Sequence, residues 1–150
     1  MQRRTLRVSL VAVLSTLLLS LVPVTRAEYR AKFFASYQIT NVSESVDRVE
    51  VTLKITLHNL TGHEVQGGGV VLYDEAPVAS PIGAFGEITS LPASGKVALS
   101  QQFSISPIEY TRWKQGIQPS LKILLPDGQG GSSLEHIDLA PASYPAVEKQ

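Results

Sequence analysis

The segment from Arg48 to His58 alternates apolar and polar side chains with a period of two. Its apolar side chains all fall at odd-numbered positions: Val49, Val51, Leu53, Ile55 and Leu57. Period two places successive side chains on opposite faces of a strand, whereas a helix repeats every 3.6 residues. The segment therefore predicts a half-buried β-strand with an inner face of β-branched residues and leucine.

Several other segments carry strand patterns separated by turn residues. Further strands are predicted over residues 29–40, 63–73, 86–91, 96–105, 121–125 and 133–139. The turn residues Asn59 to Gly62 predict a hairpin that joins residues 48–58 to residues 63–73. Residues 75–85 hold two prolines, which cannot donate ladder hydrogen bonds, so this segment is predicted to be a loop or an irregular edge.

One segment predicts a helix. Ser106 and Glu109 have the spacing of a capping box, Pro107 stands at the first helical position, and a glycine follows at position 116. We expect one or two helical turns near residues 107–115. Tyr110 and Trp113 lie three apart there, so their rings fall on one side, either as a plug for the core or as an aromatic surface for a sugar or a proline-rich peptide.

Together these segments predict an all-β protein. About seven short strands with turns at intervals of about ten residues favour a single immunoglobulin-like antiparallel β-sandwich with a short helical turn near 107–115. A closed barrel is the alternative.

The order of segments resembles small immunoglobulin-like or fibronectin type III-like modules of exported bacterial proteins. Three stretches carry the resemblance: VEVTLKITLHNLTG (residues 49–62), GEITSLPASGKVALSQQFSIS (residues 86–106) and LKILLPDGQGG (residues 121–131). The resemblance spans residues 29–139 and implies adhesion, assembly or ligand presentation, with no catalytic residues common to the family. The cysteine and tryptophan pattern of antibody domains is missing.

The N-terminal segment has the three parts of a secretory signal peptide. Arg3, Arg4 and Arg7 precede an uncharged apolar run over residues 8–22, and Thr25-Arg26-Ala27 supplies small residues two apart. We expect cleavage after Ala27, a β-sandwich over residues 28–140 and a flexible tail over residues 141–150. The alternative is a retained membrane anchor, although 15 apolar residues fall short of the ~20 that a spanning helix needs.

Composition limits the possible partners of the mature chain. Removal of four arginines with the signal leaves 9 of the 13 Lys and Arg against 13 Asp and Glu, a net charge of −4. This charge disfavours nucleic acids and anionic membranes. We expect the chain to be exported to the periplasm or the cell exterior, with no stable membrane insertion after cleavage. We expect its partner to be another exported or envelope protein.

Few residues suggest chemistry. The chain has no cysteine and no G-x-S-x-G elbow, and the glycines at 67–69 run into a strand, which favours a bulge over a phosphate loop. His58 and His63 flank the predicted hairpin turn and are candidate metal ligands, but zinc needs three or four ligands. The carboxylates Asp74, Glu75 and Glu109 are candidates for an acid and base pair, yet nothing in the sequence places two of them over a cleft.

These observations favour an exported non-catalytic module without a cofactor that binds a protein or an envelope component. The alternative is a small periplasmic metal-binding protein that uses His58 and His63. For the module, Tyr110 and Trp113 are the candidate binding surface.

Overall fold

The computed structural model describes residues 30–75 and 78–142, so the predicted signal peptide and most of the predicted tail lie outside the described residues. Its elements follow in the order β1 (Phe33–Glu44), β2 (Val49–Asn59), β3 (Gly68–Asp74), β4 (Ser80–Ile88), β5 (Lys96–Ile105), α1 (Pro107–Lys114), β6 (Ser120–Pro126), β7 (Ser132–His136) and β8 (Asp138–Pro141). Within these ranges, no helix has the length and apolar character to cross a membrane.

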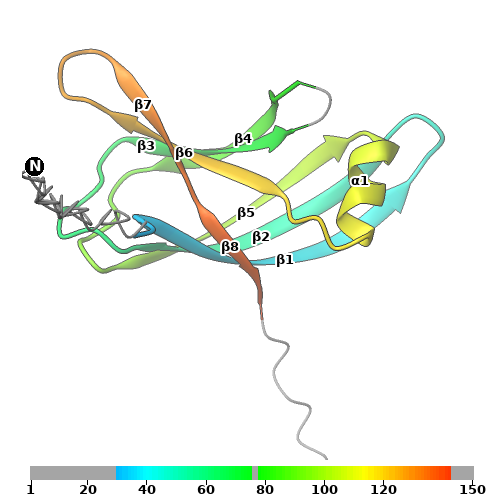
Figure 1. Cartoon of the computed structure of the whole chain (residues 1–150), viewed down its shortest axis with the longest axis horizontal. Coiled ribbons are helices and arrows are strands. Elements are labelled where there is room, and N and C mark those ends of the chain that lie inside the picture. The colour runs from blue at the N-terminus through cyan, green and yellow to red at the C-terminus, as the bar shows by residue number, and fades with distance from the viewer. Residues whose placement is uncertain (1–29, 76–77, 143–150) are drawn as a thin grey trace, which may run out of the picture.

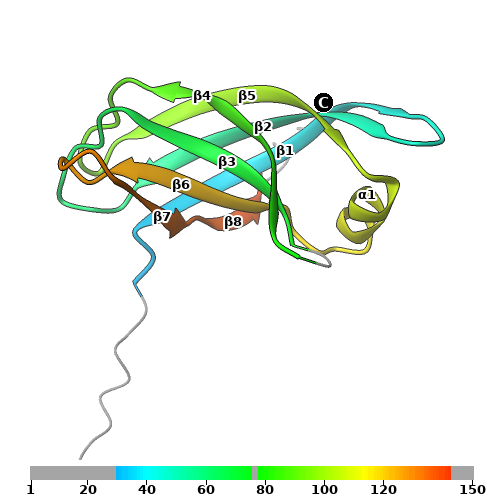
Figure 2. The same cartoon turned by 90° about the horizontal axis from the view of Figure 1, so that it is seen from above.

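The strands form two four-stranded sheets that pack as a sandwich (Figures 1 and 2). Sheet 1 has the order β5-β2-β1-β8, and sheet 2 has the order β4-β3-β6-β7. All pairings are antiparallel except that between β1 and β8, which is parallel. The predicted all-β sandwich with one short helix is confirmed, with eight strands in the described residues rather than about seven.

The alternation of β2 supplies a continuous row of core side chains. Its five odd-numbered apolar side chains are each at most 3% exposed. They share one cluster with fully buried side chains of sheet 2: Val70, Leu72, Leu121 and Ile123. Full burial of each such side chain stabilises the fold by about 1.5–3 kcal/mol.

The segment after β2 crosses to sheet 2 instead of returning beside β2. β2 pairs with β1 and β5, whereas β3 pairs with β4 and β6. The predicted hairpin between residues 48–58 and 63–73 is therefore wrong. The turn chemistry at Asn59 serves the crossing: its fully buried amide donates to the carbonyls of His63 (2.7 Å) and Pro92 (3.1 Å) and accepts from the Thr61 hydroxyl (2.7 Å).

The strand predicted over residues 133–139 is divided between the two sheets. β7 pairs with β6 in sheet 2, and β8 pairs with β1 in sheet 1. Between them Ile137 is fully buried, and its N–H donates to the Leu121 carbonyl at 3.1 Å. The prediction of one strand is wrong. The sequence pattern did not show the division, because Ile137 is apolar and buried and so continues the alternation where the chain passes from one sheet to the other. β8 also extends to Pro141, one residue into the predicted tail.

Two further predictions concern β4 and α1. Residues 80–85 of the segment predicted to be a loop or an irregular edge belong to the edge strand β4, which contains Pro81. The separate strand predicted over residues 86–91 is wrong, because its first three residues continue β4 and Leu91 forms only an isolated bridge with Val65. Helix α1 begins after Ser106, whose hydroxyl accepts a hydrogen bond from the Glu109 N–H at 3.0 Å. The predicted N-cap and the proline at the start of the helix are confirmed.

Candidate binding surface

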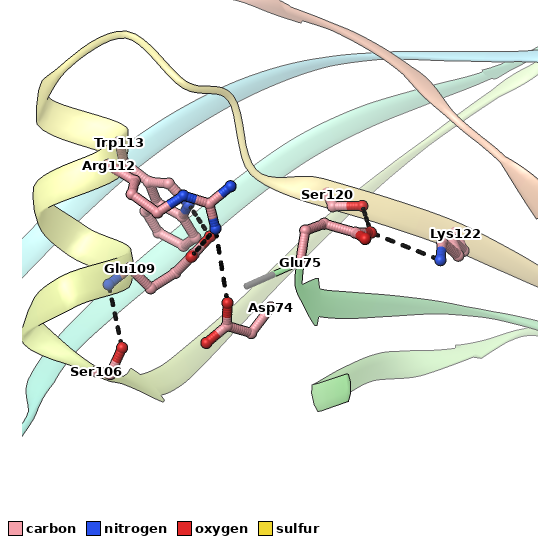
Figure 3. Close-up of polar contacts among 8 residues, drawn as sticks. All are labelled: Asp74, Glu75, Ser106, Glu109, Arg112, Trp113, Ser120 and Lys122. Atoms are coloured by element: carbon pink, nitrogen blue, oxygen red, sulfur yellow. Dashed lines mark hydrogen bonds and ion pairs between the residues drawn. The ribbon is translucent and has the colours of Figure 1, made fainter. Parts of the chain in front are cut away.

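Helix α1 closes one end of the sandwich and carries the only charged side chain that is buried in the described part of the chain, Glu109 (Figure 3). The Trp113 indole donates to Glu109 Oε1 at 2.8 Å, and Arg112 Nη1 donates to Glu109 Oε2 at 2.6 Å. Burial raises the pKa of Glu109, and the neighbouring Asp74 carboxylate raises it further. The buried carboxylate is thus held by two donors from its own helix.

The structure brings together two of the three candidate carboxylates. Arg112 Nη1 lies 2.6 Å from Glu109 and 3.6 Å from Asp74 (Figure 3). Glu75 belongs to a separate contact, in which the Ser120 hydroxyl donates to it at 2.5 Å and holds its pKa below the ordinary value, with Lys122 adding to this effect. The shared guanidinium ties α1 to the end of β3, which is a structural use of the carboxylate pair.

The Glu109 carboxylate makes other contacts than those the capping-box motif predicts. In a capping box the Glu109 carboxylate would reach back to the N-cap N–H, but here it faces Trp113 and Arg112. Packing of the indole against the core places its N–H beside this carboxylate. Spacing alone could not have shown this, because residues three and four positions ahead on a helix face are equally close.

The two aromatic residues of α1 have different environments. Trp113 is 8% exposed and belongs to the core cluster. Tyr110 is half-buried, and the Lys114 ammonium lies 4.7 Å from the centre of its ring. An aromatic surface on this helix would therefore depend on Tyr110 alone.

The two candidate metal ligands lie in different settings. His58 stands at the end of β2, where its ring centroid is 5.9 Å from that of Phe34. His63 lies in the crossing segment, which does not turn back beside β2. Across residues 30–75 and 78–142, no three His, Cys, Asp or Glu side chains form a group that could hold a metal ion. The hairpin on which the two-histidine site depended is absent.

The outer face of sheet 2 carries apolar side chains that the core does not use. Leu124 and Leu134 are 39% and 49% exposed, and they stand directly opposite each other on β6 and β7. On the neighbouring β3, Val71 and Tyr73 alternate with buried Val70 and Leu72, so they also point outward and remain half-buried. We call Val71, Tyr73, Leu124 and Leu134 the sheet-2 face.

Charged groups at the sheet-2 face are few. Glu87 stands opposite Gly69 on β4 and is exposed. Lys122 Nζ lies 4.3 Å from the centre of the Tyr73 ring and 3.5 Å from the Glu75 carboxylate. His136 lies opposite Lys122 on β7. A phosphate-binding surface needs several available cations, whereas an apolar surface with a mixed polar rim is typical of protein interfaces.

Gly69 opens the centre of this face. It pairs with Leu124 across β3 and β6, and a Cβ placed at position 69 would meet no atom within 4 Å. The missing side chain leaves the Leu124 side chain accessible from the β3 side. Sequence reasoning assigned the glycines at 67–69 to a bulge and did not identify this opening.

An open groove of about 630 Å³ lies at the end of the sandwich opposite α1. Its walls come from Phe33, the crossing segment around Val65 and the end of β6 at Pro126. An ion pair between Lys32 Nζ and Glu135 Oε1 at 2.8 Å spans the two sheets there. Thr61, His63, Glu64 and Gln66 add further polar groups to its lining.

Comparison with known proteins gives little. The chain matches no protein-family model and no curated protein. It is similar to two solved structures from Vibrio harveyi, a GH20 exo-β-N-acetylglucosaminidase in complex with N-acetylglucosamine and an inactive mutant of a GH20 exo-β-N-acetylglucosaminidase. Each is 13% identical with a TM-score of 0.44, over 74% of this chain and 18% of the enzyme chain. A likeness at this level carries no argument about activity.

Proposed function

We propose that this chain is an exported, non-catalytic immunoglobulin-like module that binds a partner protein through the sheet-2 face. One observation carries the proposal: Leu124 and Leu134 stand side by side and exposed on a face whose inner side already supplies the core. Large exposed apolar side chains that gather on one face mark interaction sites.

The strand order supports the immunoglobulin-like assignment. Immunoglobulin domains pair strands A with B, B with E, C with F, and F with G. With β1, β2, β3, β5, β6 and β7 lettered A, B, C, E, F and G, all four pairings are present. β4 then takes the place beside strand C where variable-type domains add strands, and α1 lies in the connection between E and F.

The buried polar groups of the described residues have structural partners. Every buried side-chain nitrogen or oxygen in the described residues has a hydrogen-bond partner. The groups with the most suggestive chemistry, Glu109 and Arg112, hold α1 in place. The partner that suits the sheet-2 face presents apolar side chains of its own, because the face has one lysine, and that lysine is paired with Glu75.

Export is the part of the proposal that rests on residues 1–27. The basic start, the apolar run and Ala27 support cleavage before Glu28. N-terminal sequencing of protein recovered from the exported fraction should begin at Glu28. Recovery of a membrane-bound product that retains Met1 would contradict both cleavage and release.

Capture of the partner tests the binding surface. The chain is expressed with its own leader, purified from the exported fraction, immobilised and exposed to an envelope extract from the same organism. Gly69→Lys places a charge in the centre of the sheet-2 face, at a position where a Cβ meets no atom within 4 Å, and Gly62→Lys adds the same charge at a loop position where a Cβ is equally free. We expect at least one protein that wild type and Gly62→Lys retain and Gly69→Lys loses.

The result that would contradict the proposal is equally specific. If all three forms retain the same proteins in the same amounts, the sheet-2 face is not the binding surface. A thermal unfolding transition in each of the three forms serves as the control that each is folded. A loss of capture by a folded Gly69→Lys variant is then due to the altered surface.

A further inference from the structure

Four strands form the outer edges of the two sheets, and three of them are blocked against strand addition. β7 has five residues, and β8 has four and ends at Pro141. β4 contains Pro81, and its pairing with β3 has two register irregularities. Short strands, prolines and bulges are the devices by which natural sheets prevent edge-to-edge pairing.

β5 has none of these devices. It is ten residues long, contains no proline, and carries Lys96, at its first position, as its only charged side chain. Its register with β2 runs without a shift from Lys96 to Ile105. A long, regular and nearly uncharged edge is a template for another strand.

The register shows which backbone groups of β5 face the open edge. The Asn59 N–H donates to the Gly95 carbonyl at 2.9 Å, one position beyond the pairing of His58 with Lys96. In an antiparallel ladder the hydrogen-bonded pairs recur at every second residue. The odd-numbered residues of β5 therefore bond to β2, and the N–H and C=O groups of the even-numbered residues point toward the open edge.

We propose that two copies of this chain associate by antiparallel pairing of β5 with β5. Centred on Gln101, this pairing sets apolar residues opposite apolar residues on the inner side: Leu99 against Phe103, and Val97 against Ile105. On the outer side, Ser100 meets Gln102 and Ala98 meets Ser104. Lys96 falls at the two ends of the pairing, so no like charges stand opposite each other.

Gln101 lies at the two-fold axis of the proposed pairing. It occupies an inner position of β5, opposite fully buried Leu53 on β2, yet it is polar and exposed. At the two-fold axis each Gln101 amide faces its copy, and an amide can both donate and accept a hydrogen bond. In a single copy the Gln101 amide donates to the Gln102 carbonyl at 3.2 Å. A two-fold contact places the same residue on both sides of the axis, so a second copy adds a partner amide to each Gln101.

The association has a consequence for binding. Because β5 belongs to sheet 1, pairing at its edge leaves the sheet-2 face of each copy uncovered. The dimer would present two such faces and gain avidity for a repeated or multimeric partner. This consequence rests on the proposed function, whereas the association itself does not.

Sedimentation equilibrium of the exported protein from about 10 µM to about 1 mM tests the association by mass action. Wild type should sediment as a dimer in the upper part of this range. Gln102→Pro removes an N–H that points to the open edge and no bond to β2, so this variant should be monomeric, whereas Gln102→Ala should remain dimeric.

A second variant keeps the test decisive if Gln102→Pro does not fold. Gln101→Glu sets two carboxylates opposite each other at the axis, so its dimer should dissociate near neutral pH and re-form when the carboxylates are protonated. A wild type that is monomeric throughout, or a folded Gln102→Pro that remains dimeric, would overturn the proposal. Neither result affects the Gly69→Lys capture test, so the two proposals can fail separately.

Discussion

The two sheets have similar inner faces and different outer faces. On sheet 1 the outward positions across β1, β2 and β5 are dominated by hydroxyl and amide residues, as in the rows Ser36–Thr56–Ala98 and Gln38–Lys54–Ser100. On sheet 2 the outward row of β6 and β7 contains Leu124 and Leu134. A solvated sheet is stable with polar outward residues. The outward leucines of sheet 2 are the difference on which the proposed binding surface rests.

The largest expected effect separates the inner and outer leucines of sheet 2. Leu72 is fully buried, so Leu72→Ala should lower the free energy of unfolding by about 2–5 kcal/mol. Leu124 is 39% exposed, and Leu124→Ala should cost less than about 1 kcal/mol. Urea unfolding of both variants measures the difference. Equal losses would mean that Leu124 is part of the core and that the contrast between the two outer faces is wrong.

A smaller effect separates two adjacent glycines of β3. A Cβ at position 68 would lie 3.2 Å from the Leu124 carbonyl oxygen and from Val65 Cγ1, so Gly68→Ala should cost about 1–3 kcal/mol. A Cβ at position 69 meets nothing, and Gly69→Ala should be neutral or stabilise by up to about 1 kcal/mol. Thermal unfolding of the pair is sufficient. A destabilised Gly69→Ala variant would show that the opening above Gly69 is not free space.

The smallest effect concerns the buried carboxylate of α1 and its pH dependence. Burial raises the pKa of Glu109 above its ordinary value of 4.5, so the folded chain holds this proton more tightly than the unfolded chain. Its contribution to stability is therefore complete below pH 4.5 and declines as the pH rises through the raised pKa of the folded state. Each unit of difference in pKa corresponds to about 1.4 kcal/mol.

Glu109→Gln tests this dependence, because its amide oxygen can still accept the Trp113 indole N–H but does not titrate. Urea unfolding from about pH 4 to about pH 7 should show wild type losing stability relative to the variant as the pH rises. Parallel curves for the two proteins would contradict the raised pKa. No second carboxylate can be compared with it, since Glu109 is the only buried charged residue in the described part of the chain.

Local patterns in the sequence predicted the parts of the fold that local physics decides. The inner row of β2 follows from a strict period of two, and the start of α1 follows from Ser106 and Pro107. The pairing partners could not be predicted, because the same turn residues at Asn59 suit a hairpin and a crossing between sheets. The sequence did not show that the chain passes from sheet 2 to sheet 1 at Ile137, because this buried apolar residue continues the alternating pattern.

The candidate site was less predictable than the fold. Val70-Val71-Leu72 and Ile123-Leu124-Leu125 are continuous apolar runs, so the sequence does not show which residue of each run faces outward. Pairing decides this, since it places Leu124 opposite Gly69 and Leu134. The role of Glu109 depended on the placement of the Trp113 indole, which is a property of tertiary packing.

The most direct test of the account is the affinity of the captured partner for two matched variants. Leu124→Asp and Gln38→Asp each add one negative charge at an exposed outward position, the first on sheet 2 and the second on sheet 1. An exposed leucine at the centre of an interface should be worth at least about 1.4 kcal/mol, so Leu124→Asp should raise the Kd at least tenfold. The Kd for Gln38→Asp should stay within about twofold of wild type. An unchanged Kd for Leu124→Asp, or equal losses for both variants, would contradict a binding function of the sheet-2 face.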